Sequence, residues 1–253
     1  MPDLPWKTAW VVGASSGIGR AVALRLAAAG VHVAASARDE AALGELAREA
    51  GENISVYPLD VTDDAAVSDV LAEIEAARGS VDLAVLSAGV WLPFRLDDLQ
   101  IAAFRTSMDV NYMGTVNAVA ALLPGLRDRD AGQIAIVSSV AGYFGLPKSA
   151  TYGPTKAALI NLAEALKTEL DGSGVKISLV NPGFVETRLT AKNSFPMPFM
   201  MQPDAAAERI VGGLASGRFE VAFPRRFVLM LKAAGLSPYP VFFWGIRKLV
   251  RRK

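Results

Sequence analysis

The stretch VVGASSGIGR, residues 11–20, has serine and glycine residues at spacings that fit two different chemistries. The pattern Gly13-x-Ser15-x-Gly17 fits the sharp turn that exposes the nucleophilic serine of a hydrolase. The pattern Gly13-x-x-x-Gly17-x-Gly19 fits a glycine loop that holds the phosphates of a dinucleotide. Both motifs lie between a strand and a helix, so residues elsewhere in the chain must decide between them.

A serine hydrolase needs a histidine as its general base, and its triad follows the order serine, acid, histidine along the chain. His32 is the only histidine, and no Asp or Glu lies between it and Ser15. His32 also opens a predicted strand, whereas the catalytic groups of a parallel sheet gather at the carboxyl ends. These observations exclude the hydrolase, and we expect His32 to be an ordinary strand residue.

A second group of residues suited to catalysis lies in SSVAGYFGLPKSATYGPTK, residues 138–156. Of the five tyrosines, only Tyr152 has a lysine four residues later, Lys156, and this spacing places both side chains on one face of a helix. Pro154 fits the first helical turn, where its missing N–H is not needed. Ser139 ends the preceding predicted strand. A neighbouring ammonium lowers the pKa of a tyrosine from about 10, which suits proton transfer.

Short apolar runs alternate with longer helical segments along the chain. The runs suit strands that are buried on both faces, as in a parallel sheet. Predicted strands are residues 8–14, 31–37, 54–60, 82–89, 132–139, 176–183 and 219–223. Predicted helices are residues 18–30, 39–51, 63–79, 97–127 and 152–172, with another that begins at Asp204. This alternation predicts an α/β fold with a doubly wound parallel sheet, the three-layer Rossmann fold.

The composition excludes several classes of site. Cysteine is absent from the 253 residues, which excludes disulfides, thiolate catalysis and sulfur-ligated metals. With one histidine and no carboxylate cluster of suitable spacing, we expect no metal site. The N-terminus lacks the pattern of a secretory signal, and no apolar run is long enough to span a bilayer. We therefore expect a cytoplasmic protein.

Charge is divided unevenly between the two ends of the chain. Nine basic residues and one acid, Glu220, lie from Arg218 onward, out of totals of 26 and 25. Subtraction leaves 17 basic and 24 acidic residues before Arg218, so a body of net charge −7 carries a segment of net charge +8. We expect a catalytic domain over residues 1–224 and a basic, apolar tail over residues 225–253.

Across roughly residues 7–224, the sequence resembles the short-chain dehydrogenase/reductase family. The family's TGxxxGxG loop is present with Val12 in place of threonine, and its NNAG motif appears as LSAG, residues 86–89. Both departures remove polar side chains near the strand ends. The resemblance also covers Asp60-Val61 after the third strand, Asn111 in a helix, the Ser139, Tyr152 and Lys156 set, and PGxxxT at residues 182–187.

The resemblance implies hydride transfer between nicotinamide and a ketone or secondary alcohol. Tyr152 would be the acid/base, Lys156 its electrostatic support and a ribose ligand, Ser139 the group that polarises the carbonyl, and Asn111 the holder of a water. The implied cofactor-binding residues are Gly13, Ser15, Ser16, Gly17, Ile18, Gly19, Arg38, Asp60, Val61, Ala88, Gly89, Asn111, Tyr152, Lys156, Pro182, Gly183, Val185 and Thr187. The alternative is a cofactor-sensing binding protein on the same fold with little turnover.

The end of the second strand bears on the choice of cofactor. An acid there suits the ribose hydroxyls of NAD, whereas an arginine pairs with the 2′-phosphate of NADP. Arg38 follows the strand, with Ser36 and Ala37 where an acid is expected. Asp39 comes next, and the basic residue that many NADP-dependent members carry in the glycine loop is absent, with Ser16 in that region. The balance favours NADP(H) over NAD(H).

The segment after the sixth strand, about residues 186–216, corresponds to the family's mobile substrate flap. Its apolar side chains form an adaptable wall that suggests an apolar substrate, or they pack on the sheet. These side chains are Phe195, Met197, Phe199, Met200 and Met201.

The tail is compatible with more than one role. Pro238 and Pro240 break its apolar stretches, which are too short to span a bilayer. Its basic residues, with the aromatic run at 242–244, fit either peripheral contact with an anionic membrane or packing on the body or a second subunit. No nucleic-acid motif accompanies the basic cluster. By resemblance, we expect a homodimer or homotetramer.

Overall fold

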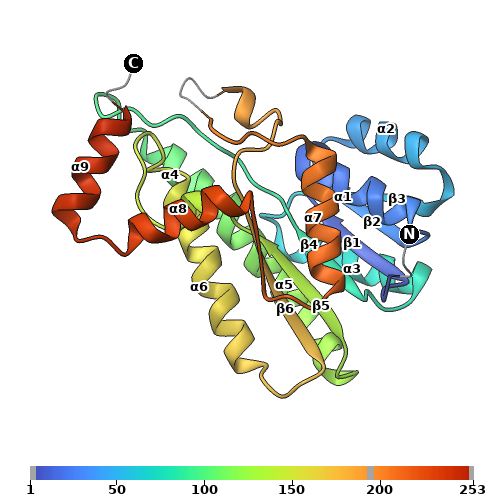
Figure 1. Cartoon of the computed structure of the whole chain (residues 1–253). Helices are drawn as coiled ribbons and strands as arrows, with labels where there is room; N and C mark the ends of the chain where they lie inside the picture. Colours follow the sequence, from blue (N-terminus) through green and yellow to red (C-terminus); the bar gives the residue numbers. More distant parts are fainter. Residues whose placement is uncertain (1–3, 193–196, 251–253) are drawn as a thin grey trace.

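Seven parallel strands form one sheet in the computed structural model, which describes residues 4–192 and 197–250 (Figure 1). The strands are β1 Thr8–Val12, β2 His32–Ala37, β3 Ile54–Pro58, β4 Leu83–Leu86, β5 Gly132–Val137, β6 Val175–Pro182 and β7 Glu220–Phe223. Their order is β3-β2-β1-β4-β5-β6-β7, and every neighbouring pair is parallel. This arrangement confirms the predicted doubly wound Rossmann sheet, and each strand lies in a predicted run except that β6 begins one residue earlier, at Val175.

Helices cover both faces of the sheet, and each face has its own apolar core (Figure 1). The helices that pack on one face are α1 Gly17–Ala28, α2 Glu40–Ala50 and α7 Pro203–Ala215. Those that pack on the other face are α3 Asp64–Arg78, α5 Gly114–Asp128 and α6 Gly153–Glu169. Because both faces are covered, β1 and β4 are buried throughout, which explains why their sequences are continuously apolar.

The helix predicted over residues 97–127 begins later than expected and is interrupted. The helix α4 spans Ile101–Met108, a π-helical turn spans Asp109–Met113, and α5 follows without a break. The side chain of Asn111, within the π turn, is fully buried and pairs with the backbone of Val90. Such turns are frequent at functional sites, and periodicity alone does not reveal them.

The tail forms two helices, α8 Arg225–Gly235 and α9 Tyr239–Val250, at one end of the molecule (Figure 1). Pro238 lies between them, which agrees with the break predicted there, whereas Pro240 lies in the first turn of α9 and does not interrupt it. In the part of the chain that the structure describes, no helix is both long enough and apolar enough to cross a membrane.

Two glycines bring the ends of β1, β4 and β6 close together. Gly13 has a φ of +91°, and a Cβ there would lie 2.6 Å from the backbone nitrogen of Ala88. Gly17 has a φ of +56°, and a Cβ there would lie 2.8 Å from the Cγ2 of Thr187. Side chains at these positions would force the three loops apart, so the glycines permit the close approach of segments that are distant in sequence.

We predict that Gly13→Ala lowers the free energy of unfolding by roughly 2–4 kcal/mol, through backbone strain and collision with Ala88. Gly44→Ala is the matched control, because Gly44 lies within α2 and a Cβ there meets no atom within 4 Å. It should be neutral or stabilising by about 0.5–1 kcal/mol. Urea denaturation followed by circular dichroism measures both values. Equal effects of the two substitutions would contradict the assigned packing.

Candidate active site

The residues singled out from the sequence gather at the carboxyl edge of the sheet. The glycine loop follows β1, Arg38 follows β2, and Asp60 lies beyond β3. Ala88 and Gly89 follow β4, Ser139 follows β5, and the segment that contains Thr187 follows β6. Parallel strands end at the same edge, so the topology accounts for this convergence.

Local structure positions Ser139 and Tyr152 at the starts of two helices. Ser139 is the N-cap of a short 3-10 helix, Val140–Gly142, and its hydroxyl accepts a hydrogen bond from the N–H of Ala141 (3.1 Å). It therefore lies two residues beyond β5 rather than within the strand. Tyr152 is the N-cap of α6, and Pro154 occupies the first turn, as expected.

Lys156 lies one turn into α6 and is only 4% exposed. Its ammonium donates a hydrogen bond to the carbonyl oxygen of Val137 (2.9 Å) and lies 5.5 Å from the ring centroid of Tyr152. Burial lowers the pKa of Lys156 to about 8, because a low-dielectric environment disfavours the charged form. The site therefore holds a cation that can lose its proton slightly above neutral pH.

Tyr152 retains its proton at neutral pH even with the Lys156 ammonium 5.5 Å from the centroid of its ring. Burial raises the pKa of its hydroxyl to about 12, and a hydrogen bond from Ser139 partly offsets this effect. The phenol is thus a proton donor whose anion requires further stabilisation before it can form near neutral pH. A cation beside the hydroxyl supplies such stabilisation.

Asn111 joins the loop after β4 to the start of α6. Its Oδ1 accepts a hydrogen bond from the N–H of Val90 (2.7 Å), and its Nδ2 donates to the Val90 carbonyl (3.0 Å) and to the Thr155 hydroxyl (3.0 Å). Thr155 in turn donates to the carbonyl of Tyr152 (2.7 Å). Thr155 was not predicted from the sequence as a site residue, although it lies between Tyr152 and Lys156. Its hydroxyl links Asn111 to the Tyr152 backbone.

The turn between β1 and α1 fits the pyrophosphate of a dinucleotide. The side chain of Ser16, the N-cap of α1, makes no capping hydrogen bond, so it leaves the N–H groups of the first turn to an external acceptor. Gly17 brings this turn against Thr187, and Gly89 lies beside Lys156, where a Cβ would be 3.7 Å from its Nζ. At Gly17 the Thr187 side chain occupies the place of a Cβ, whereas at Gly89 the lack of a side chain keeps further atoms away from the Lys156 ammonium. We therefore find the donor set and the space compatible with NAD(P).

An ion pair and a helix cap lie at the end of β2, where the ribose of such a cofactor is expected. Arg38 is exposed, and its guanidinium lies 3.9 Å from the carboxylate of Asp60. The backbone N–H of Thr62 is the main group that holds the pKa of Asp60 below its ordinary value, and Arg38 adds to the effect. Asp39 caps α2 through the N–H of Ala42 (3.0 Å). Asp39 therefore has a structural role at the start of α2.

The predicted flap is attached to the body at both of its ends. Met201 and the stretch at residues 184–186 exchange backbone hydrogen bonds of 2.9 Å, and Thr190 donates to the Val185 carbonyl (2.7 Å). Phe199 and Met200 are exposed, whereas Phe195 lies outside the described residues. Residues 203–215 form α7, which packs against α1 on the sheet.

The tail reaches the candidate site, which the sequence did not indicate. Phe227 of α8 packs against Phe184 and Phe199, with ring centroids 5.7 and 5.9 Å apart. A Cβ on Gly183 would lie 3.1 Å from the Phe227 ring, so the close approach depends on that glycine. Phe227 thus links the segment after β6 to the flap, and no local signal in the tail sequence marks it.

A polar cluster fixes α8 to the end of β6 and the start of β7. The carboxylate of Glu220 accepts hydrogen bonds from Tyr143 (2.8 Å), Asn181 (3.0 Å) and Lys232. Burial alone would raise the pKa of Glu220, but these donors, Lys232 foremost, hold it below its ordinary value. Burial and the Glu220 carboxylate also raise the pKa of Tyr143.

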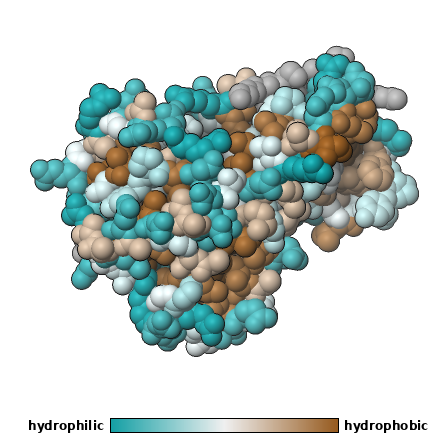
Figure 2. Space-filling model, turned by 180° about the vertical axis from the view of Figure 1, so that it is seen from behind, coloured by the Kyte–Doolittle hydropathy of each residue, from teal (hydrophilic) through white to brown (hydrophobic). Residues whose placement is uncertain are grey.

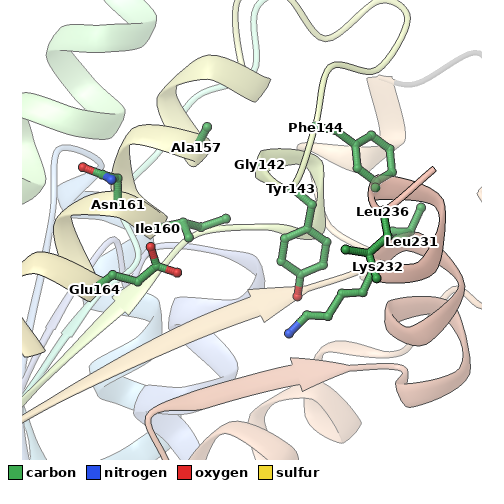
Figure 3. Close-up of a pocket in the computed structure, with 11 residues that line it drawn as sticks. Gly142, Tyr143, Phe144, Ala157, Ile160, Asn161, Glu164, Leu231, Lys232 and Leu236 are labelled. Carbon is green, nitrogen blue, oxygen red and sulfur yellow. The ribbon is translucent and has the colours of Figure 1, made fainter. Parts of the chain in front are cut away.

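Beside this cluster, a groove of about 590 Å³ separates α6 from α8. Figure 3 shows the Lys232 side chain extending toward the Tyr143 hydroxyl on one side of the groove, with Asn161 and Glu164 of α6 on the other. The groove lies next to the loop that follows Ser139.

Comparisons with known proteins agree with this geometry. The short chain dehydrogenase family profile matches residues 7–196. A protein of Myxococcus xanthus, named an uncharacterized oxidoreductase, is 37% identical over 98% of this chain and 100% of its own length. Another protein of that name, from Staphylococcus epidermidis, is 34% identical over 85% of this chain and 93% of its own. The Myxococcus match is long enough to include most of the tail.

Solved structures share the fold and contain nicotinamide cofactors. A short chain dehydrogenase/reductase from Burkholderia phymatum in complex with NAD has a TM-score of 0.84 and 25% identity, over 92% of this chain and 94% of the other. The closed form of a serine dehydrogenase complexed with NADP+ has a TM-score of 0.78 and 27% identity, over 85% and 94%.

We predict that Phe227→Ala lowers the free energy of unfolding by roughly 1–3 kcal/mol, because it removes a half-buried ring from the junction of α8, Phe184 and Phe199. Leu229→Ala on the same helix is the control, since Leu229 is 67% exposed and should change the value by less than about 0.5 kcal/mol. Thermal and urea unfolding measure both. If Phe227→Ala is as harmless as the control, α8 does not pack on the site.

Proposed function

The chain belongs to the short-chain dehydrogenase family of NAD(P)-dependent oxidoreductases, and from that premise we propose that it transfers a hydride between NADP(H) and an apolar ketone or secondary alcohol. The placement of Ser139, Tyr152 and the buried Lys156 at one edge of the sheet is the observation that carries the proposal. The alternative, a cofactor-sensing protein with little turnover, is less favoured because the chain has all three of these groups.

In the direction of reduction, the carbonyl carbon gains a hydride and the carbonyl oxygen gains a proton. The nicotinamide supplies the hydride when the cofactor is bound. Tyr152 donates the proton, which breaks its O–H bond as the alcohol O–H bond forms. The Ser139 hydroxyl donates to Tyr152 in this structure, and with a ketone bound it would donate to the carbonyl oxygen instead and so polarise it.

Lys156 stabilises the phenolate that Tyr152 forms when it gives up its proton. Its pKa of about 8 leaves the ammonium mostly protonated at neutral pH. As pH rises through 8, the cation is lost, and the phenolate loses its stabilising charge. Reductase activity should therefore fall on that alkaline limb.

The water predicted at Asn111 stays a prediction, and the hydrogen bonds of Asn111 to Val90 and Thr155 support its role in positioning α6.

The choice of an apolar substrate is supported by the aromatic groups beside the site. Phe184 follows the PG pair, and Phe199 belongs to the flap. Phe227 joins them from the tail. A carbonyl compound with a hydrocarbon body would bury that body against these rings, with only its carbonyl oxygen directed to polar groups.

A homodimer or homotetramer is also part of the proposal. Family members pair through the two long helices that correspond to α5 and α6. Figure 2 shows hydrophobic side chains gathered on the rear face where α5 lies. Met113, at the start of α5, is 44% exposed. A second subunit on this face would remove such surface from water.

We predict that Tyr152→Phe lowers kcat roughly 10²–10⁴-fold, because the proton donor is lost, while the affinity for NADPH is unchanged. The control is Tyr239→Phe, which loses an exposed hydroxyl on α9 and should keep full activity. NADPH oxidation with a panel of lipophilic ketones measures turnover, and fluorescence titration measures cofactor binding. Unchanged turnover in Tyr152→Phe, or loss of cofactor binding instead, would refute the assigned role.

The preference for NADP(H) rests on Arg38. It is exposed beside the expected ribose position, and Asp39, the acid that would favour NAD, accepts a hydrogen bond as the cap of α2. A 2′-phosphate would pair with the guanidinium through charge-assisted hydrogen bonds. The same arginine would make no comparable ionic contact with the uncharged 2′-hydroxyl of NADH.

We predict that Arg38→Ala raises the Kd for NADPH by roughly 10–100-fold, because one or two charge-assisted hydrogen bonds to the 2′-phosphate are lost. The Kd for NADH should be nearly unchanged. Arg48→Ala, at an exposed position of α2, is the matched control and should alter neither constant. Energy transfer from tryptophan to the bound nicotinamide reports both Kd values. Wild-type protein that binds NADH as tightly as NADPH would make Arg38 an ordinary surface residue.

A further inference from the structure

Several large apolar side chains in the tail are exposed to solvent. We call these residues the tail face: Leu229, Met230, Leu236, Tyr239, Phe243 and Trp244, which are 51–88% exposed. Leu236 follows the end of α8 and borders the groove beside α6, and the other five lie on α8 and α9 (Figure 1). Surfaces of this kind mark contact with a protein or a membrane.

Both tail helices are packed against the body, so the exposure of these side chains is not due to detached helices. The opposite side of α8 is packed, since Val228 is 6% exposed and Phe227 contacts Phe184. The ring of Phe242 in α9 packs edge-on against Phe144, with centroids 5.0 Å apart. The body therefore holds one side of the helix pair and leaves the tail face turned outward.

Charge in the tail has one sign. After Glu220 the sequence contains eight Lys and Arg residues and no acid. Glu220 itself pairs with Lys232. Lys248 lies 5.1 Å from the ring centroid of Trp244, so a cation and an aromatic side chain lie on the same side of α9, one turn apart. Aromatic rings beside lysine and arginine are typical of groups that lie at the headgroup level of a bilayer.

These observations favour an anionic membrane over a second copy of the chain. A symmetric dimer through the tail face would bring two such tails together with no acid to compensate their charges. The tail of each copy could contact the acidic body of the other in a two-fold dimer, which would pair opposite charges but would not provide the apolar layer that suits the large exposed side chains of the tail face. Anionic lipid headgroups offer negative charge, and the acyl boundary beneath them accepts apolar side chains.

We propose that the tail face binds in the plane of an anionic lipid bilayer. The helix α9 has 12 residues and is about 18 Å long, which suits a helix that lies along the surface. Phe243 and Trp244 enter the interfacial layer, while Arg247 and Lys248 contact the headgroups. The proposal requires no catalytic activity, so it stands or falls independently of the function proposed above.

The test uses the full-length protein in vesicle co-sedimentation. Vesicles of phosphatidylcholine alone are compared with vesicles that contain roughly 30% phosphatidylserine. The tail variant is Phe243→Glu/Trp244→Glu. Its matched control is Leu96→Glu/Leu99→Glu, which changes two leucines that are 84% and 56% exposed but lie outside the tail. Circular dichroism of each variant shows whether the fold is kept.

We expect the wild type and the control to pellet with the anionic vesicles at least about tenfold more than with the neutral ones, and added salt to weaken the binding. The tail variant should lose that binding. A charge variant, Arg247→Gln/Lys248→Gln, should bind about five- to thirtyfold more weakly to the anionic vesicles.

The proposal would be overturned if the tail variant and its control bound equally to the anionic vesicles, or if the wild type did not bind them. The proposal would also be overturned if the wild type did not bind vesicles and light scattering showed that the wild type self-associates whereas the tail variant does not. That outcome would identify a second copy as the occupant of the tail face.

Discussion

Burial of the Lys156 ammonium is the constraint on which the rest of the site depends. A buried cation needs acceptors at fixed positions, because the cost of removing it from water must be offset. The end of β5 supplies the Val137 carbonyl, and the Ser138 hydroxyl donates to the carbonyl of Lys156 itself (2.7 Å). Gly142 allows this approach, since a Cβ there would lie 2.7 Å from the Lys156 carbonyl carbon. The position of α6 against β5, and with it the position of Tyr152, follows from these contacts.

The sequence was sufficient to predict the sheet and the region of the site, because both depend on local patterns. Each strand is an apolar run, and the convergence of the motifs follows from strands that end at one edge. The π turn around Asn111 was not predictable, since an extra residue in one turn hardly alters the apolar periodicity. The Thr155 bridge and the Phe227 contact were also missed, because each depends on a partner far away in sequence. The functional roles of the selected residues stay predictions.

The tail changes how the chain as a whole is understood. Its composition suggested an appendage to the catalytic domain, but α8 is packed on Gly183 and Phe184 and bound to Glu220. The inner side of the tail therefore belongs to the architecture of the site, and its outer side carries the exposed tail face. A single segment thus connects the surroundings of the site to a surface that is basic and apolar. Substitutions on the two sides should have separable effects, because the residues involved do not overlap.

The central claim is that this fold carries out hydride transfer and does not merely bind the cofactor. The most direct measurement is a single-turnover reaction with NADPH deuterated at C4, a lipophilic ketone and the purified protein, followed by mass spectrometry of the alcohol. Our account predicts that the deuterium appears on the carbinol carbon of the product and that no labelled alcohol forms without the protein. Tight binding of NADPH with no label transferred to any ketone of a broad panel would contradict the account and favour the cofactor-sensing alternative.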